Sequence, residues 1–242
     1  MKPYYADDSV TLYHGDCREV MATMDERSVD CVITDPPYTE RTHVGARSNS
    51  ASATAGGRVL SGSGAAFASI TDEGLRDAFA ECGRVTRRWV VANLAYQHAF
   101  AYDVEPPVGL RVLRLGVWVK TNPMPQISGD RPGQGWESIA YMHRADEKPT
   151  WHGGGRHGNF VLPVQQGEGH PTVKPLAMVG AWVRDFTEYG ETVFDPFAGS
   201  GTTLRAAINE GRRAVGVEAE ERYCELIASR LSQGVLDFGE VS

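Results

Sequence analysis

The stretch CVITDPPYTE, residues 31–40, places a carboxylate, two prolines and an aromatic ring directly after an apolar run that reads as a buried strand. Asp35 and the backbone carbonyl of Pro36 could accept hydrogen bonds from an amine and stabilise the positive charge that develops on it. Pro36 and Pro37 have a fixed φ and no N–H, which holds these acceptors rigidly. Tyr38 offers a flat face on which a planar ring can stack. Taken alone, the same residues also fit a proline turn with Tyr38 packed on the core.

A second stretch, TVFDPFAGSGTTLRAAINEGRRAVGVEAE, begins at residue 192 and predicts a strand, a glycine-rich turn, a helix and another strand. Gly199 and Gly201 let a ligand approach the backbone, and a helix starting at Thr202 or Thr203 offers free N–H groups. Glu218 ends the second strand about 20 residues after the glycines, where an acid binds ribose hydroxyls in dinucleotide-type sites. The pattern predicts a cofactor that contains a nucleoside.

The charge of this second stretch indicates which cofactor it takes. Asp195 ends the first strand, and a carboxylate there suits a cationic ligand better than a pyrophosphate. Leu204 stands where a dinucleotide fingerprint would have its third glycine. S-adenosylmethionine, with a sulfonium and an ammonium group, meets these conditions. The structural alternative is a tight turn with a helix cap at Ser200 or Thr202.

The elements that position these residues alternate between apolar runs and helical patterns along the chain. This alternation predicts one α/β domain over residues 1–242, with a mostly parallel sheet covered on both faces. LRVLRLGVWVK and WESIAYMHR follow each other without a helix, which predicts an antiparallel pair at one edge of the sheet. Three long loops, at 39–70, 121–135 and 145–170, are typical of functional lids or disordered segments.

Composition excludes several classes of protein. The four cysteines are far apart and form no CxxC pair, so we expect reduced thiols in a cytoplasmic protein, with neither disulfides nor zinc. No apolar run approaches ~18 residues and the N-terminus lacks a signal core, so no membrane association is expected. The net charge of -7 argues against coating nucleic acid by bulk positive charge, although arginines gather locally.

A glycine-rich stretch, WHGGGRHG at 151–158, carries two histidines and an arginine. His152 and His157 lack a third ligand on the same stretch, so no metal site is predicted. We interpret it as a mobile loop facing DNA, with Arg156 as its contact.

Five short motifs in a fixed order resemble a known family. DPPY at 35–38 and DPFAGSGTT at 195–203 resemble the amino-methyltransferases that modify exocyclic nitrogens of DNA bases, in the order of their permuted β class. HGDC at 14–17, VWVKTNPMP at 117–125 and HPTVKP at 170–175 are similar to further segments of that family. The resemblance covers nearly the whole chain.

The resemblance implies a fold and a cofactor site. The fold is the Rossmann-like methyltransferase fold, with a mostly parallel seven-stranded sheet, one antiparallel edge strand and a circularly permuted motif order. Asp16 would bind the cofactor adenine, while Thr172 and Lys174 would line its methionine side. Asp16 as a helix N-cap and Lys174 as a solvated cation are the alternatives. The full set implied for S-adenosylmethionine is Asp16, Cys17, Asp35, Thr172, Lys174, Asp195, Pro196, Phe197, Gly199, Ser200, Gly201, Thr202 and Glu218.

The resemblance also implies the reaction. A target adenine flipped out of duplex DNA would be methylated on its 6-amino group, with Asp35, Pro36, Pro37 and Tyr38 as the catalytic motif. An aspartate at its head resembles the adenine group more than the serine-led cytosine group. Methylation of the cytosine 4-amino group, of RNA or of a protein amide, and a catalytically silent DNA-binding module, are the alternatives.

The expected DNA contacts lie in two segments. Residues 39–70 are predicted to be mobile without DNA, and Arg41, Arg47 and Arg58 would reach phosphates when the segment closes. Residues 145–169 are the short stretch available for target recognition, where many relatives carry a large separate domain. The resemblance further implies a homodimer, which relatives often form.

Overall fold

The computed structural model describes residues 1–37, 39, 70–126, 129–167 and 170–234. The described part contains a nine-stranded sheet with the order β1-β2-β11-β10-β3-β4-β6-β5-β7. Its strands are β1 (Tyr5–Ala6), β2 (Val10–His14), β3 (Val29–Thr34), β4 (Thr86–Leu94), β5 (Leu110–Lys120), β6 (Trp136–Arg144), β7 (Asn159–Leu162), β10 (Thr192–Asp195) and β11 (Arg213–Glu218). A separate hairpin pairs β8 (Gln165–Gly167) with β9 (His170–Val173).

Strand directions confirm the expected mostly parallel sheet and correct its details. Strands β2, β11, β10, β3 and β4 run parallel to one another. The expected antiparallel pair is β5 with β6, but β6 is not the edge strand, because it lies between β4 and β5 and is antiparallel to both. The short strands β1 and β7 extend the sheet to nine strands instead of seven. Strand β7 belongs to the 145–169 stretch, so part of that stretch is built into the sheet.

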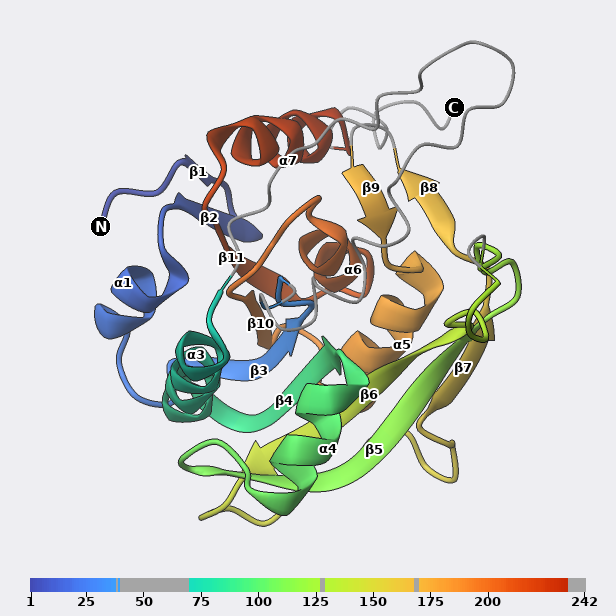
Figure 1. Cartoon of the computed structure of the whole chain (residues 1–242). Helices are drawn as coiled ribbons and strands as arrows, with labels where there is room; N and C mark the ends of the chain where they lie inside the picture. The colour runs from blue at the N-terminus through green and yellow to red at the C-terminus, as the bar shows by residue number, and fades with distance from the viewer. Residues whose placement is uncertain (38, 40–69, 127–128, 168–169, 235–242) are drawn as a thin grey trace, which may run out of the picture.

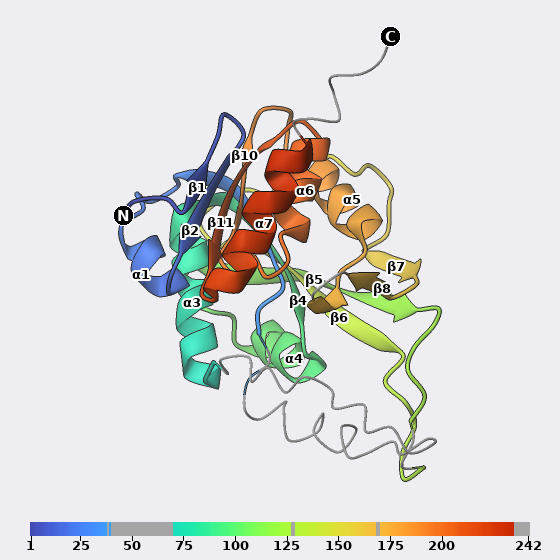
Figure 2. The same cartoon turned by 90° about the horizontal axis from the view of Figure 1, so that it is seen from above.

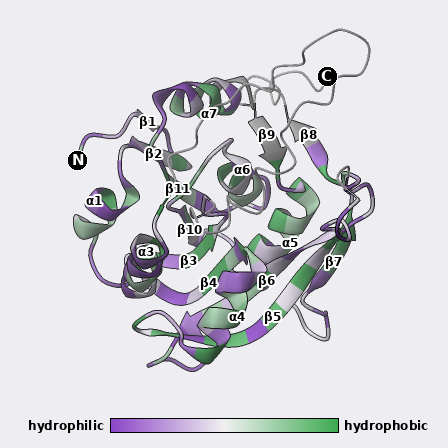
Figure 3. Cartoon of the chain, in the orientation of Figure 1, coloured by the Kyte–Doolittle hydropathy of each residue, from purple (hydrophilic) through white to green (hydrophobic). Residues whose placement is uncertain are grey.

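Helices cover both faces of the sheet (Figures 1 and 2). One face packs against α1 (Cys17–Ala22), α3 (Asp72–Val85) and α4 (Tyr96–Val104). The other packs against α5 (Leu176–Phe186), α6 (Thr202–Asn209) and α7 (Glu221–Gly234). All six residues of β3 are buried, as expected for a central parallel strand with a helical layer on each side. Figure 3 shows α5 mainly hydrophobic, whereas α7 carries both kinds of residue.

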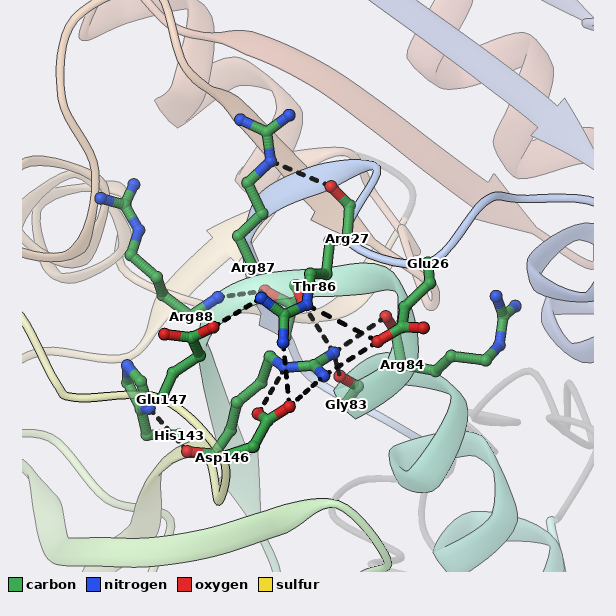
Figure 4. A network of polar contacts seen from close by, with 11 residues as sticks. Glu26, Arg27, Gly83, Arg84, Thr86, Arg87, Arg88, His143, Asp146 and Glu147 are labelled. Carbon is green, nitrogen blue, oxygen red and sulfur yellow. Dashed lines mark hydrogen bonds and ion pairs between the residues drawn. The ribbon is translucent and has the colours of Figure 1, made fainter.

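The amino end of the parallel strands is held by an arginine network (Figure 4). Arg144, at the end of β6, is buried and donates to the carbonyl of Gly83 at 3.0 Å. It also pairs with Glu26 at 3.0 Å and with Asp146 at 2.7 Å. Arg27 pairs with Asp146 at 2.9 Å. These contacts tie β6 to the segments before β3 and β4, far from the opposite edge where the acidic motifs end their strands.

Two expectations from composition can be compared with the described residues. Cys17, Cys31, Cys82 and Cys224 are free and buried, as predicted for reduced thiols. Within the described ranges, no helix is long and apolar enough to span a bilayer.

Candidate active site

A cleft of about 700 Å³ opens at the carboxyl ends of the parallel strands. Strand β10 lies between β3 and β11, so the two predicted motifs meet there although they are far apart in the sequence. The cleft is lined by most of the predicted site, namely Asp16, Cys17, Asp35, Pro36, Pro37, Lys174, Asp195, Pro196, Phe197, Gly199, Ser200, Thr202 and Glu218. The folding of the sheet therefore brings the two motifs into one site.

Asp35 begins a chain of alternating charges that crosses the sheet. Lys174 Nζ donates to Asp35 Oδ2 at 2.5 Å and lies 3.4 Å from Glu137 Oε2. Glu137 Oε1 in turn pairs with Lys120 Nζ at 2.7 Å. Burial opposes the charged form of Glu137, but the ammonium groups of Lys174 and Lys120 outweigh it and lower its pKa. Lys174 is therefore a buried partner of Asp35, and the alternative of a solvated cation is wrong.

The segment after the catalytic motif is attached at one described point. Tyr38 lies outside the described residues, so its stacking role stays a prediction. Thr39 Oγ1 lies 3.1 Å from His98 Nε2 and its backbone bridges to Ile70, so both ends of the intervening segment meet here. The predicted mobility of residues 39–70 and the contacts of Arg41, Arg47 and Arg58 fall on that segment, which is outside the described residues apart from its ends.

The glycine-rich turn adopts the backbone that its sequence requires. Gly199 and Gly201 have φ of 53° and 82°, in the left-handed region that favours glycine. A Cβ on Gly201 would lie 2.9 Å from Ile227, so the turn also packs too closely for a side chain. Glu218 Oε2 accepts from Gly199 N at 2.8 Å, and its Oε1 accepts from Glu220 N at 2.8 Å. Glu218 thus clamps the turn, and burial raises its pKa.

Asp195 lies beneath the same turn and is only 3% exposed. Its Oδ1 accepts from Thr34 Oγ1 at 2.7 Å and from Phe197 N at 3.0 Å. Burial raises the pKa of Asp195 to about 6, although these donors oppose the shift. A cationic ligand in the cleft would therefore stabilise the ionised form of this carboxylate.

Asp16 and Cys17 lie at the start of α1, on the rim of the cleft. Asp16 is the N-cap of α1: Oδ1 accepts from Arg18 N at 2.8 Å, and Oδ2 pairs with the Arg18 guanidinium at 2.6 Å. The N-cap alternative is thus observed, and the same side chain also lines the cleft. Burial raises the pKa of the Cys17 thiol to about 12, so it stays protonated at neutral pH.

The side chains that line the cleft fit S-adenosylmethionine. Three carboxylates, those of Asp16, Asp195 and Glu218, line a cleft whose walls include Ile33, Phe197, Val217 and other apolar residues. Acids surrounded by apolar walls suit a ligand with a cationic sulfur and a nucleoside. Within the described ranges, no group of three or more His, Cys, Asp or Glu side chains is arranged to hold a metal ion.

Two of the predicted residues that the structure describes, Arg156 and Gly201, do not line the cleft. Arg156 pairs with Asp185 at 2.9 Å, near the carboxyl end of α5. Lys174 precedes the amino end of this helix, so the two sites are separated by its length of about 16 Å at 1.5 Å per residue. Gly201 lies in the turn but behind its lining residues. Thr172 belongs to β9, two residues before Lys174 in the chain, and its contact with the cofactor stays a prediction.

Two site residues were not foreseen from the sequence. Asn93, near the end of β4, lines the cleft, and the rule that selected Asp35 and Asp195, a polar residue at the end of an apolar strand, would have found it. Glu137 is the second residue of β6, and only the antiparallel direction of that strand brings its amino end to the site. No local signal distinguishes Glu137 from an ordinary surface acid.

Comparisons with known proteins agree with this geometry. The family model N6_N4_Mtase, described as DNA methylase, matches residues 29–229. The chain is 27% identical to the Type II methyltransferase M2.DpnII of Streptococcus pneumoniae, over 95% of this chain and 92% of that protein. It is 24% identical to the Type II methyltransferase M.HinfI of Haemophilus influenzae, over 96% and 71% of the two chains.

Solved structures share the fold. The M1.HpyAVI-SAM complex superposes with a TM-score of 0.65 at 23% identity, over 92% of this chain and 99% of that one. The cytosine-N4-specific PvuII DNA methyltransferase gives a TM-score of 0.70 at 17% identity, over 95% and 88%. At these identities the likeness concerns the fold alone. Because the family model spans most of the chain and both motifs share one cleft, this protein belongs to the N6_N4_Mtase family of S-adenosylmethionine-dependent DNA methylases.

Proposed function

We propose that this protein transfers a methyl group from S-adenosylmethionine to the 6-amino group of an adenine flipped out of duplex DNA. The observation that carries the proposal is the convergence of Asp35 and Asp195, from neighbouring strands β3 and β10, on one cleft. Thr34, next to Asp35 in sequence, donates to Asp195 and links the two strand ends. An acceptor for an amine and a carboxylate for a cationic methyl donor would thus share one site, which favours direct transfer.

Asp35 and the carbonyl of Pro36 would hold the amine. The lone pair of an exocyclic amino nitrogen is delocalised into the ring, so acceptors that hold its hydrogens favour the pyramidal nitrogen that attacks. They also stabilise the positive charge that develops on it. Lys174 supports this role because it holds Asp35 Oδ2 at 2.5 Å and so fixes the orientation of the carboxylate. Pro36 and Pro37 keep the backbone carbonyls rigid.

The cofactor would be held by groups on the other side of Asp35. Glu218 would bind the ribose hydroxyls, Asp16 the adenine amino group, and Asp195 the cationic end, with Thr172 and Lys174 near the methionine. S-adenosylmethionine supplies the electrophilic methyl group. Phe197 and the turn over Gly199, Ser200, Gly201 and Thr202 would enclose the nucleoside, with Cys17 and Pro196 completing the wall.

The DNA side of the proposal depends on groups outside the cleft floor. Tyr38 would stack on the flipped ring, and Arg41, Arg47 and Arg58 would contact phosphates, whose neutralisation supplies most non-specific affinity. The short stretch 145–169 is the proposed source of target contacts, and Arg156 is its proposed phosphate contact. With DNA as substrate, the proposed location is the cytoplasm. A homodimer is proposed from the family resemblance and is tested by light scattering.

Adenine is favoured over cytosine by the aspartate that opens the catalytic motif. Nucleoside mass spectrometry of DNA incubated with the protein and labelled cofactor tests this directly. We expect label in 6-methyladenine, and label in 4-methylcytosine would overturn the adenine assignment. Mapping the methylated bases in the same DNA gives the recognition sequence.

Variants connect the product to the site. Asp35→Asn should abolish transfer while S-adenosylmethionine still binds, and Tyr38→Ala should reduce transfer strongly, with Tyr38→Phe milder because stacking needs only the ring. Asp103→Asn, an exposed acid on α4, is the matched control and should transfer at the wild-type rate. Full transfer by Asp35→Asn would contradict the proposed mechanism.

A further inference from the structure

Asn93 is a buried amide that uses neither of its polar groups within the described part of the chain. Its side chain lines the cleft, and the residue is 3% exposed. Among the residues that the structure describes, neither Nδ2 nor Oδ1 has a hydrogen-bond partner. A buried amide without partners costs folding free energy, so such a group at a cleft wall points to a ligand that supplies the missing bonds.

The strand order indicates which ligand this is. The sheet runs β11-β10-β3-β4, so Glu218 and Asp195 lie on one side of Asp35 and Asn93 lies on the other. Ala92 registers with Thr34, which puts Asn93 beside the position of Asp35. Asn93 is two residues after Val91, which packs with Ile33 in the core beneath α5, so its side chain faces the α5 side. The Asn93 amide is therefore next to the amine acceptor and away from the cofactor acids.

The groups assigned to the amine of the base cannot also donate to its ring. Asp35 and the Pro36 carbonyl are acceptors, and the nearby ammonium of Lys174 is already held by Asp35 and Glu137. Adenine and cytosine both present an unprotonated ring nitrogen beside the carbon that bears their amino group, whereas guanine and thymine present an N–H beside a carbonyl. An amide N–H aimed at that edge would donate a hydrogen bond to adenine or cytosine, whereas it would face another N–H in guanine or thymine.

We propose that Asn93 Nδ2 donates a hydrogen bond to the ring nitrogen beside the amino-bearing carbon of the flipped base and so helps to select adenine or cytosine over guanine or thymine. This inference rests on the proposed function, because it requires a base in the cleft. Asp35 and the Pro36 carbonyl accept the two amino hydrogens of the base, so the ring nitrogen is recognised by the Asn93 Nδ2 group. Its Oδ1 is one further acceptor at the same edge, and the assignment does not depend on it.

The test combines a protein variant with altered bases. Asn93→Leu removes both polar groups at similar volume, and its melting temperature should equal or exceed the wild-type value because an unpaired buried amide is lost. Tyr102→Phe is the matched control, since Tyr102 is also buried with an unpartnered hydroxyl but does not line the cleft. This control should methylate DNA at the wild-type rate.

Single-turnover rates are measured on duplexes that carry the mapped site with adenine, 1-deazaadenine or 7-deazaadenine at the target. The wild type should lose at least about tenfold on 1-deazaadenine, as expected for one lost hydrogen bond to a base edge, and 7-deazaadenine serves as the control for a distant ring nitrogen. Asn93→Leu should methylate adenine more slowly than the wild type by a similar factor, and its rate on 1-deazaadenine should equal its rate on adenine. Its dissociation constant for S-adenosylmethionine, measured by calorimetry, should change less than about twofold.

Different results separate the two proposals. If Asn93→Leu is slower than the wild type by the same factor on adenine and on both analogues, the ring-nitrogen contact is overturned. Weakened cofactor binding without coupling to the analogues would instead assign Asn93 to the cofactor. Both outcomes leave the proposed function intact, because that is read from wild-type label in the unmodified duplex. If that label is in cytosine, the same cycle is run with 3-deazacytosine, and wild-type protein that labels no base overturns both proposals.

Discussion

Lys174 Nζ lies 2.5 Å from Asp35 Oδ2 and 3.4 Å from Glu137 Oε2, so one buried ammonium joins the catalytic motif to the amino end of the antiparallel strand β6. Lys120 closes the other end of this chain of charges through Glu137. Two ammonium and two carboxylate groups thus compensate one another at the cleft floor. The arrangement suggests that the orientation of Asp35 depends on residues that never touch the substrate.

Lys174→Gln should lower the single-turnover methylation rate at least tenfold, because the Asp35 carboxylate loses the cation that orients it. If orientation is the main role of Lys174, the dissociation constant for S-adenosylmethionine should change less than about threefold. Rapid-quench kinetics and calorimetry give the two values. Lys148→Gln, an exposed lysine, is the control. A large loss of cofactor affinity at an unchanged rate would show that Lys174 binds the methionine part of the cofactor and does not orient Asp35.

Glu137→Gln should lower the free energy of unfolding by about 2 kcal/mol at pH 7, since two partly buried ammonium groups lose their shared counter-ion. The folded-state pKa of Glu137 is lowered, so its stabilising effect is present above the ordinary value of 4.5 and is lost as the pH falls through the folded pKa. The difference between wild type and variant should therefore shrink at acid pH. Urea denaturation at several pH values measures it, with Glu105→Gln as an exposed control.

Asp195 should make cofactor binding depend on pH. Its pKa is raised to about 6, so below that value it is protonated and loses its attraction for a cation. We expect the dissociation constant for S-adenosylmethionine to rise up to tenfold per pH unit below about 6 and to level off above it. Calorimetry between pH 5 and 8 tests this. Asp195→Asn should bind more weakly with a flat profile, and a flat wild-type profile would argue against the contact.

The same raised pKa predicts how stability changes in the ligand-free protein. Because the folded state binds the Asp195 proton more tightly than the unfolded state, this residue's contribution falls as the pH rises from 3.8 to about 6. Bound S-adenosylmethionine should offset that loss. Thermal shifts produced by the cofactor should thus be larger at pH 7 than at pH 5, and equal shifts would speak against it.

Glu218→Gln should weaken S-adenosylmethionine binding by about 1.5–3 kcal/mol, the usual value of hydrogen bonds to a charged group. The carboxylate also accepts from Gly199 N and Glu220 N, so an amide at this position cannot hold both N–H groups through acceptors. The glycine-rich turn should loosen as well, which hydrogen exchange at Gly199 can report. Glu225→Gln on the exposed side of α7 serves as the control. Unchanged affinity in a folded variant would remove Glu218 from the site.

The class of fold, the cofactor and the two motifs could be predicted from the amino-acid sequence. These features are local: an apolar strand that ends in Asp35 or Asp195, and glycines at 199 and 201 whose positive φ only glycine adopts easily. Parallel strands place all their carboxyl ends at one edge, so residues that end such strands could be assigned to one site without knowing their distances.

The other side chains that reach that edge could be identified only from the folded chain. Glu137 arrives there because β6 runs antiparallel between β4 and β5, and neighbouring residues in the sequence cannot reveal that direction. Lys174 pairs with Asp35, which is 139 residues away in the chain, and Arg156 pairs with Asp185 and does not line the cleft. Asn93 stands out because both polar atoms of its amide lack partners among the described residues while its side chain lines the cleft. Pairings of this kind depend on distances between elements, and packing fixes those distances only when the sheet and its helices are complete.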